Sequence, residues 1–175
     1  MKPKRDARAP AAILTAALVF LGGLVVTVIP RESPDGATAA GTGASRPHAA
    51  EIDERFRQGV VMLHAKRYEY AVAAFHQVLK YAPDLPEAHV DMGYALVGLG
   101  QYKPAYDFFE SATTLRPQQA NAYYGMALAL EGMGDIRGAI GAMRTYLHLV
   151  DAADPHRRKA ESALWEWEGS LKSQK

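Results

Sequence analysis

The chain has 175 residues, with 20 Lys and Arg, 19 Asp and Glu, and no Cys. Its length allows one domain of ordinary size plus an appendage, and its near-neutral balance excludes a general electrostatic attraction of the whole chain to nucleic acid. The absence of thiols excludes disulfides, thiolate metal sites and cysteine nucleophiles.

The N-terminal residues predict a membrane anchor. Residues 1–10 form a basic tail, and residues 11–29, between Pro10 and Pro30, contain no charged side chain and are mostly Leu, Val, Ile, Phe and Ala. As a helix this stretch spans roughly 28 Å, close to the hydrocarbon thickness of a bilayer. Because basic flanks stay on the cytoplasmic side, we expect a single-pass protein of the inner (cytoplasmic) membrane, with its N-terminus cytoplasmic and the remainder periplasmic or extracellular.

A cleaved signal peptide is the alternative, and it would give a secreted protein. Ala37-Thr38-Ala39 has the small-x-small form that signal peptidase prefers, although it lies well downstream of the apolar run. Residues 31–50 are rich in Ala, Gly, Pro and Ser and predict a disordered linker. With random-coil scaling, such a linker would hold a following domain roughly 25 Å from the membrane.

Residues 52–153 repeat with a period of 34 residues. Small residues recur in two columns, and large apolar residues and prolines recur in others: Gly59, Gly93 and Ala127; Ala71, Ala105 and Ala139; Phe75, Phe109 and Met143; Pro83 and Pro117. Small residues permit close helix approach, whereas proline ends a helix or begins the next link. The pattern predicts six helices in three pairs, at 52–65 with 68–81, 86–99 with 102–115, and 120–133 with 136–150.

The period and these columns resemble the tetratricopeptide repeat (TPR), whose unit is a helix-turn-helix. The resemblance implies an all-α fold, a right-handed α-solenoid of three TPR helix pairs in repeats 52–85, 86–119 and 120–153. Gly98-Leu99-Gly100 and Gly132-Met133-Gly134 fall at the turn inside successive pairs, where we expect glycine to supply backbone freedom. The chain as a whole resembles membrane-anchored bacterial TPR proteins.

Residues 155–172 predict a C-terminal capping helix. Ala160, Ala163, Leu164, Trp167 and Leu171 are spaced by three and four residues and form one apolar stripe. Such a helix would cover the apolar face at the end of the array. Trp165 lies off the stripe, as a partner anchor or as an incidental exposed aromatic.

No catalytic chemistry is predicted. The six His residues form no zinc-binding pattern, the Gly-x-Gly turns lack the strand and the Lys-Ser/Thr of a phosphate loop, and no Gly-x-Ser-x-Gly elbow is present. We therefore expect no enzyme activity, no metal, no cofactor and no nucleic-acid partner.

The TPR resemblance also implies a concave groove lined by the first helix of each pair. It would be formed by Phe56, Val60, Leu63 and His64, by Val90, Tyr94 and Val97, and by Asn121, Tyr124, Leu128 and Glu131. Some TPR domains grip a terminal carboxylate of a peptide with Lys, Arg and Asn in the groove, but here Phe56, Val90 and Tyr124 hold equivalent sites. The hypothesis is that an apolar or amphipathic segment of a partner binds there, with Tyr94 and Tyr124 as anchors.

Two alternatives stay open. The groove side chains are instead covered by the C-terminal helix or by self-association, or the protein is a self-assembling structural TPR protein that forms homo-oligomers. The preferred interpretation is a membrane-tethered scaffold or adaptor of the cell envelope. Proteins of this layout resemble accessory factors for cytochrome c maturation, pilus or secretion assembly, or protein translocation.

Overall fold

The computed structural model describes residues 48–173. The predicted basic tail at 1–10, the transmembrane helix at 11–29 and nearly all of the linker at 31–50 lie outside the described residues. Within residues 48–173, no helix combines the length and the apolar character needed to cross a bilayer.

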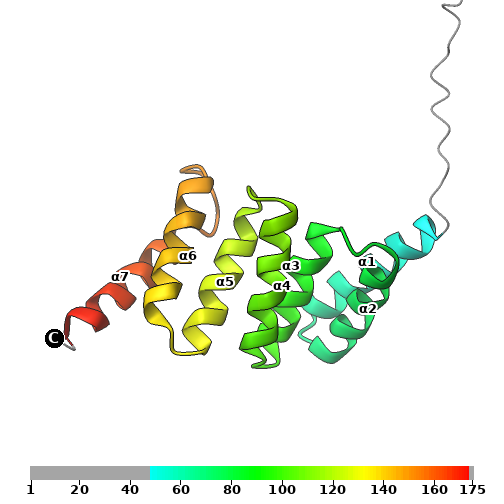
Figure 1. Cartoon of the computed structure of the whole chain (residues 1–175), viewed down its shortest axis with the longest axis horizontal. Coiled ribbons are helices and arrows are strands. Elements are labelled where there is room, and N and C mark those ends of the chain that lie inside the picture. Colours follow the sequence, from blue (N-terminus) through cyan, green and yellow to red (C-terminus); the bar gives the residue numbers. More distant parts are fainter. Residues whose placement is uncertain (1–47, 174–175) are drawn as a thin grey trace, which may run out of the picture. The chain divides into compact units, whose positions relative to one another are not determined.

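The described residues form seven α-helices, and they contain no strand. Three antiparallel pairs follow one another along the chain, and a last helix closes the series (Figure 1). The helices are α1 (Ala49–His64), α2 (Tyr68–Tyr81), α3 (Pro86–Gly98), α4 (Tyr102–Leu115), α5 (Ala120–Gly132), α6 (Ile136–Leu149) and α7 (Arg157–Ser173). Every helix begins and ends within three residues of its expected position.

The largest difference is at the start of α1. Ala49 and Ala50, predicted in the linker, are helical. The His48 ring stacks on the Tyr81 ring at 4.7 Å between centroids, and Ile52 is buried against the second helix of the pair. These contacts extend α1 by one turn beyond the point where the repeat pattern begins.

The two helices of each pair are joined by the same kind of turn, in which one residue has a positive φ. Gly100 and Gly134 have φ values of 71° and 81°, and Lys66 occupies the equivalent position in the first pair with φ 56°. In each turn this residue donates its N–H to a carbonyl three residues earlier, and the next residue donates to a carbonyl five residues earlier. This is the usual helix C-cap that glycine favours.

Glycines and aromatic rings set the spacing between helices. A Cβ on Gly93 would lie 2.6 Å from the Phe109 ring, and a Cβ on Gly59 would lie 2.5 Å from the Phe75 ring. Phe75 and Phe109 are fully buried. The rings therefore occupy the space where a side chain would stand, and the paired helices approach closely.

Gly98 and Gly132 have a different role from the one expected from the sequence. Both are inside helices, and a Cβ on either would collide with a tyrosine ring of the preceding pair, Tyr68 for Gly98 and Tyr102 for Gly132. They allow close packing between pairs, whereas Gly100 and Gly134 supply the positive φ.

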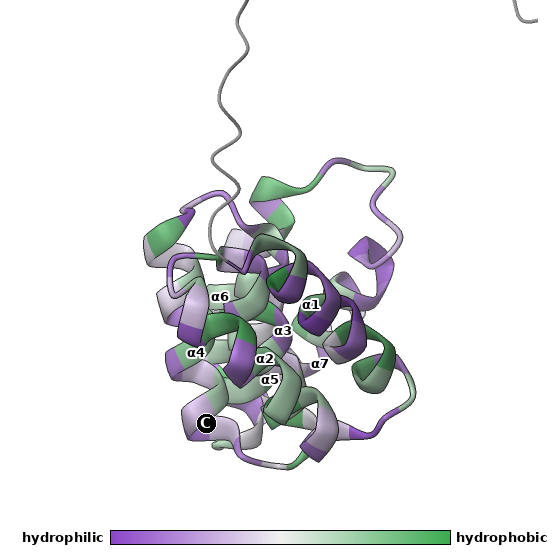
Figure 2. Cartoon of the chain, turned by 90° about the vertical axis from the view of Figure 1, so that its right-hand side faces the viewer, coloured by the Kyte–Doolittle hydropathy of each residue, from purple (hydrophilic) through white to green (hydrophobic). Residues whose placement is uncertain are grey.

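α7 covers the end of the third pair. Ala160 and Trp167 are buried in one apolar cluster with Ile140, Met143 and Tyr146 of α6. At the opposite end, α1 presents mainly charged and amide side chains and is drawn largely in purple in Figure 2. At the C-terminal end of the solenoid α7 therefore covers apolar surface, and at the N-terminal end the exposed face of α1 is mainly polar.

Candidate binding groove

The predicted groove residues lie on α1, α3 and α5, and they differ in how accessible they are. Three are exposed, six are half-buried and two are buried. The exposed residues are His64, Asn121 and Glu131, the half-buried ones are Phe56, Val60, Leu63, Tyr94, Val97 and Leu128, and the buried ones are Val90 and Tyr124.

Val90 and Tyr124 contribute little surface. Val90 is 1% exposed and belongs to a core to which all three pairs contribute. Tyr124 is 9% exposed, and its ring lies edge-on to Tyr146 at 5.1 Å between centroids. These two residues support the groove from beneath, so replacing them with alanine would disturb the core.

A hollow of about 610 Å³ lies in the part of the groove formed by the second and third pairs. It is lined by four of the predicted groove residues and by residues from α6, α7 and two loops: Tyr94, Gln118, Gln119, Ala120, Asn121, Tyr124, Leu128, Tyr146, Val150, Asp154, His156 and Lys159. Its volume lies within the range of sites that hold a drug-sized molecule or a few side chains.

Tyr94 lines the hollow and connects α3 to α5. Its hydroxyl donates to the backbone carbonyl of Asn121 at 2.7 Å, and its ring lies edge-on to the Phe109 ring at 5.1 Å between centroids. Burial raises the pKa of Tyr94 above its usual range, so the hydroxyl stays protonated and remains a donor. The ring is therefore a fixed wall of the hollow.

Tyr146 of α6 also lines the hollow. Its hydroxyl donates to Asp154 Oδ1 at 2.5 Å, and this hydrogen bond lowers the pKa of Asp154. Asp154 also accepts from the backbone N–H of His156 at 2.8 Å. The α6–α7 loop is thus anchored over α6, and the sequence pattern gave no sign that this loop would border the groove.

The capping helix α7 contacts one predicted groove residue, Glu131, through a hydrogen bond. Trp167 Nε1–H of α7 donates to Glu131 Oε1 at 2.8 Å, and Trp167 is 5% exposed. Trp165, two residues earlier, is 80% exposed. The predicted alternative, coverage of the groove by α7, therefore applies at Glu131, whereas the hollow beside Asn121 is open.

Asp91 is a groove residue that the repeat columns did not reveal. It lies on α3, one turn before Tyr94, and is half-buried. Burial is the main cause that raises the pKa of Asp91 to about 6, while His64 at the end of α1 lowers it and Glu87 raises it. Equivalent positions in the neighbouring repeats hold Arg57 and Gly125. The 34-residue period therefore does not predict an acidic residue at position 91.

No group of three or more His, Asp or Glu side chains that could hold a metal ion occurs within residues 48–173.

Two segments of the chain match sequence models described as tetratricopeptide repeats, over residues 55–84 and 86–119. Solved structures share this arrangement of helices, and two of the three described below are TPR domains. The described helices form a TPR solenoid. No curated protein sequence matches the chain.

Three of these structures come from two fungi and one bacterium. The Sgt2 TPR domain from Aspergillus fumigatus has a TM-score of 0.65 and 22% identity, and the match covers 71% of this chain and 81% of that one. The TPR2B domain of yeast Sti1, in a complex with pHsp70, has a TM-score of 0.65 and 16% identity over 69% and 98% of the two chains. The Yersinia enterocolitica type III secretion chaperone SycD, in complex with a peptide of the translocator YopD, has a TM-score of 0.64 and 13% identity over 70% and 95%.

At these identities the likeness shows the TPR fold alone. In this TPR solenoid Tyr94 and Tyr124 line the hollow, and Asp91 lies on α3.

Proposed function

We propose that this chain is a membrane-tethered TPR adaptor of the cell envelope that binds a segment of a partner protein in its groove. The observation that carries the proposal is the hollow of about 610 Å³, because it coincides with Tyr94, Asn121, Tyr124 and Leu128, where the repeat pattern predicts partner contacts. Apolar, aromatic walls with a few polar groups are typical of protein-binding sites.

The polar groups of the hollow complement its aromatic walls. Within residues 48–173, Lys159 Nζ and the Tyr124 hydroxyl make no hydrogen bond, and Asn121 uses its side-chain oxygen to accept from Gln119 Nε2 at 2.8 Å. Lys159 and Asn121 are exposed and available to a bound segment, whereas Tyr124 is buried. One solved structure of similar fold is a secretion chaperone in complex with a translocator peptide, which supports a peptide-like ligand for this chain.

The membrane tether in the proposal rests on the sequence. The basic residues 1–10, the apolar residues 11–29 and the linker 31–50 together favour an uncleaved anchor with the TPR solenoid outside the cytoplasm. An adaptor held in this way would serve the assembly or biogenesis of an envelope complex.

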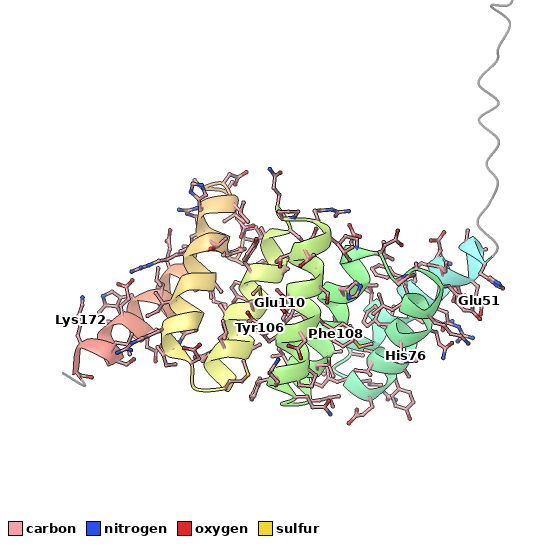
Figure 3. The ribbon with its side chains drawn as sticks, in the orientation of Figure 1. Glu51, His76, Tyr106, Phe108, Glu110 and Lys172 are labelled. Carbon is pink, nitrogen blue, oxygen red and sulfur yellow. The ribbon has the colours of Figure 1, made fainter. Side chains whose placement is uncertain are left out.

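The groove is tested with a photo-crosslinking amino acid placed in the full-length chain in its native membrane. The probe replaces Asn121, which is exposed in the hollow, and a matched control replaces His76, which is exposed on α2 (Figure 3). We expect a discrete crosslinked partner from position 121 and none from position 76, identified by mass spectrometry. Equal products from both positions, or none from position 121, would contradict a groove-binding function.

The tether is tested separately with reporters fused to the C-terminus. We expect activity from a reporter that works only outside the cytoplasm, and we expect the mature protein to retain residues 1–29 when its N-terminal peptides are analysed by mass spectrometry. A mature protein that begins near residue 40 would favour the secreted alternative.

A further inference from the structure

Asp91 is a half-buried charged group on α3, next along the chain to the groove residue Val90 and outside the lining of the hollow. Within residues 48–173 its carboxylate forms no hydrogen bond and no ion pair, although the neighbouring acid on the same helix, Glu87, pairs with Arg116. The helices on this side of the groove, α1 and α3, carry the half-buried apolar residues Val60, Leu63 and Val97. A half-buried carboxylate without a partner is unfavourable by itself.

The charges around Asp91 do not neutralise it. His64, at the end of α1, is exposed and lies near enough to lower the pKa of Asp91, yet it forms no ion pair with it. Glu87 and the protonated Tyr94 hydroxyl are the other titratable groups on α3 near it. With a pKa of about 6, Asp91 is mainly ionised at neutral pH.

The repeat does not require an acidic residue here. The equivalent residue of the first pair is Arg57, which pairs with Glu54 at 2.5 Å, and that of the third pair is Gly125, which packs against Phe109. Asp91 therefore serves neither the turn nor the packing that the other columns serve. Its role is better explained by a ligand.

We propose that Asp91 selects a basic residue of the bound segment, so that the partner presents Lys or Arg, flanked by apolar residues, and its cation pairs with the Asp91 carboxylate. The inference rests on the proposed binding function of the groove. A cation restores the interactions that the half-buried carboxylate lacks, whereas an acidic side chain would be repelled and a neutral one would leave the charge unpaired. Apolar flanks would meet Val60, Leu63 and Val97.

The test starts from random 12-residue peptides displayed on phage and selected on the full-length chain in nanodiscs at pH 7.5. Selected peptides are then measured by fluorescence anisotropy in an arginine form and in a citrulline form, in which the side chain keeps its shape and loses its charge. Both forms are measured on the wild type, on Asp91→Asn and on Asp53→Asn. Asp53 is exposed on α1 and serves as the matched control.

We expect the selected peptides to share a basic residue between apolar ones. Replacing arginine with citrulline should weaken binding to the wild type by about tenfold or more, and Asp91→Asn should have a similar effect on the arginine form only. Asp53→Asn should bind like the wild type. Peptides without a common basic residue, or equal affinity for wild type and Asp91→Asn, would overturn the role of Asp91.

A failure of the groove itself is recognised by a different variant. Asn121→Trp fills the exposed side of the hollow, and peptides that bind through the groove should lose affinity for it. If Asn121→Trp weakens binding and Asp91→Asn does not, the groove stands and the inference about Asp91 is wrong. If neither Asn121→Trp nor Asp91→Asn weakens peptide binding, the proposed function is wrong as well. If wild type alone dimerises by light scattering and Asp91→Asn does not, the occupant is a second copy, which also overturns the proposal.

Discussion

At the scale of single residues, the first pair differs from the other two in the turn that closes it. Lys66 adopts the left-handed backbone conformation that Gly100 and Gly134 adopt in the later turns. A residue with a Cβ pays roughly 1–2 kcal/mol in this conformation. Glycine avoids this cost but has more freedom in the unfolded chain, which offsets part of the gain.

Lys66→Gly should therefore raise the free energy of unfolding by about 0.5–1 kcal/mol. The measurement is urea unfolding of the chain followed by circular dichroism at 222 nm. Ala65→Gly is the matched control, because Ala65 is adjacent and has an ordinary φ of −76°; that variant should lose stability. A loss of stability in Lys66→Gly equal to that in Ala65→Gly would contradict the argument.

Asp91 gives a second prediction at this scale, and it concerns pH. Below about pH 4 the carboxyl is mainly protonated in both states and affects folding little. As the pH rises from 4 to 6 the unfolded chain ionises first, so stability falls, and above pH 6 nearly the whole cost of about 3 kcal/mol is present.

Asp91→Asn should thus be more stable than the wild type at pH 7 by up to about 3 kcal/mol, and nearly equal to it at pH 4. Urea midpoints at the two pH values measure this difference. If the two proteins differ by the same amount at both values, ionisation of Asp91 is not the cause.

At the scale of helices, the 34-residue period was enough to place the pairs, because it fixes where small residues, large residues and prolines recur. Features that break the period could not be predicted. The sequence pattern assigns Gly98 and Gly132 to turns, whereas in the structure each packs against a tyrosine ring of the preceding pair. His89 and Tyr123 differ in type, yet their ring nitrogen and hydroxyl bond to the carbonyls of Pro83 and Pro117 at 2.7 and 3.1 Å.

The groove was predicted less well than the fold for the same reason. The family pattern indicates which helix faces line the groove, but accessibility depends on neighbours that are distant in sequence. Val90 is covered by the core, and Glu131 accepts a hydrogen bond from a tryptophan 36 residues away. Asp91 has no counterpart in the adjacent repeats, so only its surroundings in three dimensions draw attention to it.

The docking of α7 leads to a prediction about its two tryptophans. Trp167→Ala should reduce the free energy of unfolding by about 3–5 kcal/mol, because it removes a buried aromatic ring and the hydrogen bond to Glu131. Trp165→Ala, on the exposed side of α7, should change it by less than about 0.5 kcal/mol. Urea unfolding of both variants provides the comparison, and equal losses would mean that α7 is not docked through Trp167.

At the scale of the described TPR solenoid, the outer face of its first helix is partly polar. Where α3 and α5 have the buried residues Ala88, Ala95, Ala122 and Ala129, α1 has the exposed Glu54 and also Val61, an apolar residue that is 60% exposed. Glu54 also accepts hydrogen bonds from Arg57 and Gln58 at 2.5 and 2.8 Å. A charged end face disfavours stacking of one array on another.

The chain should therefore not grow into stacked assemblies. Light scattering after size exclusion, with the chain in detergent, should give a protein mass that does not change with concentration. Glu54→Ala/Gln58→Met, which copies the residues of the second repeat at this face, should increase self-association. A wild-type mass that rises steadily with concentration would support the structural alternative instead.

The nearest-neighbour contacts between pairs also determine how the TPR solenoid responds to mechanical load. Helices contact only their own pair and the adjoining one, and residues 1–47 connect to the solenoid through α1. A pull on the N-terminal side reaches α1 and α2 first, where Lys66 is strained and one face is open to water. This pair would detach before the others and lengthen the connection, while the hollow, whose lining begins at Tyr94, keeps its walls. The first repeat would thus separate before the hollow is disturbed, although the groove would lose Phe56, Val60 and Leu63.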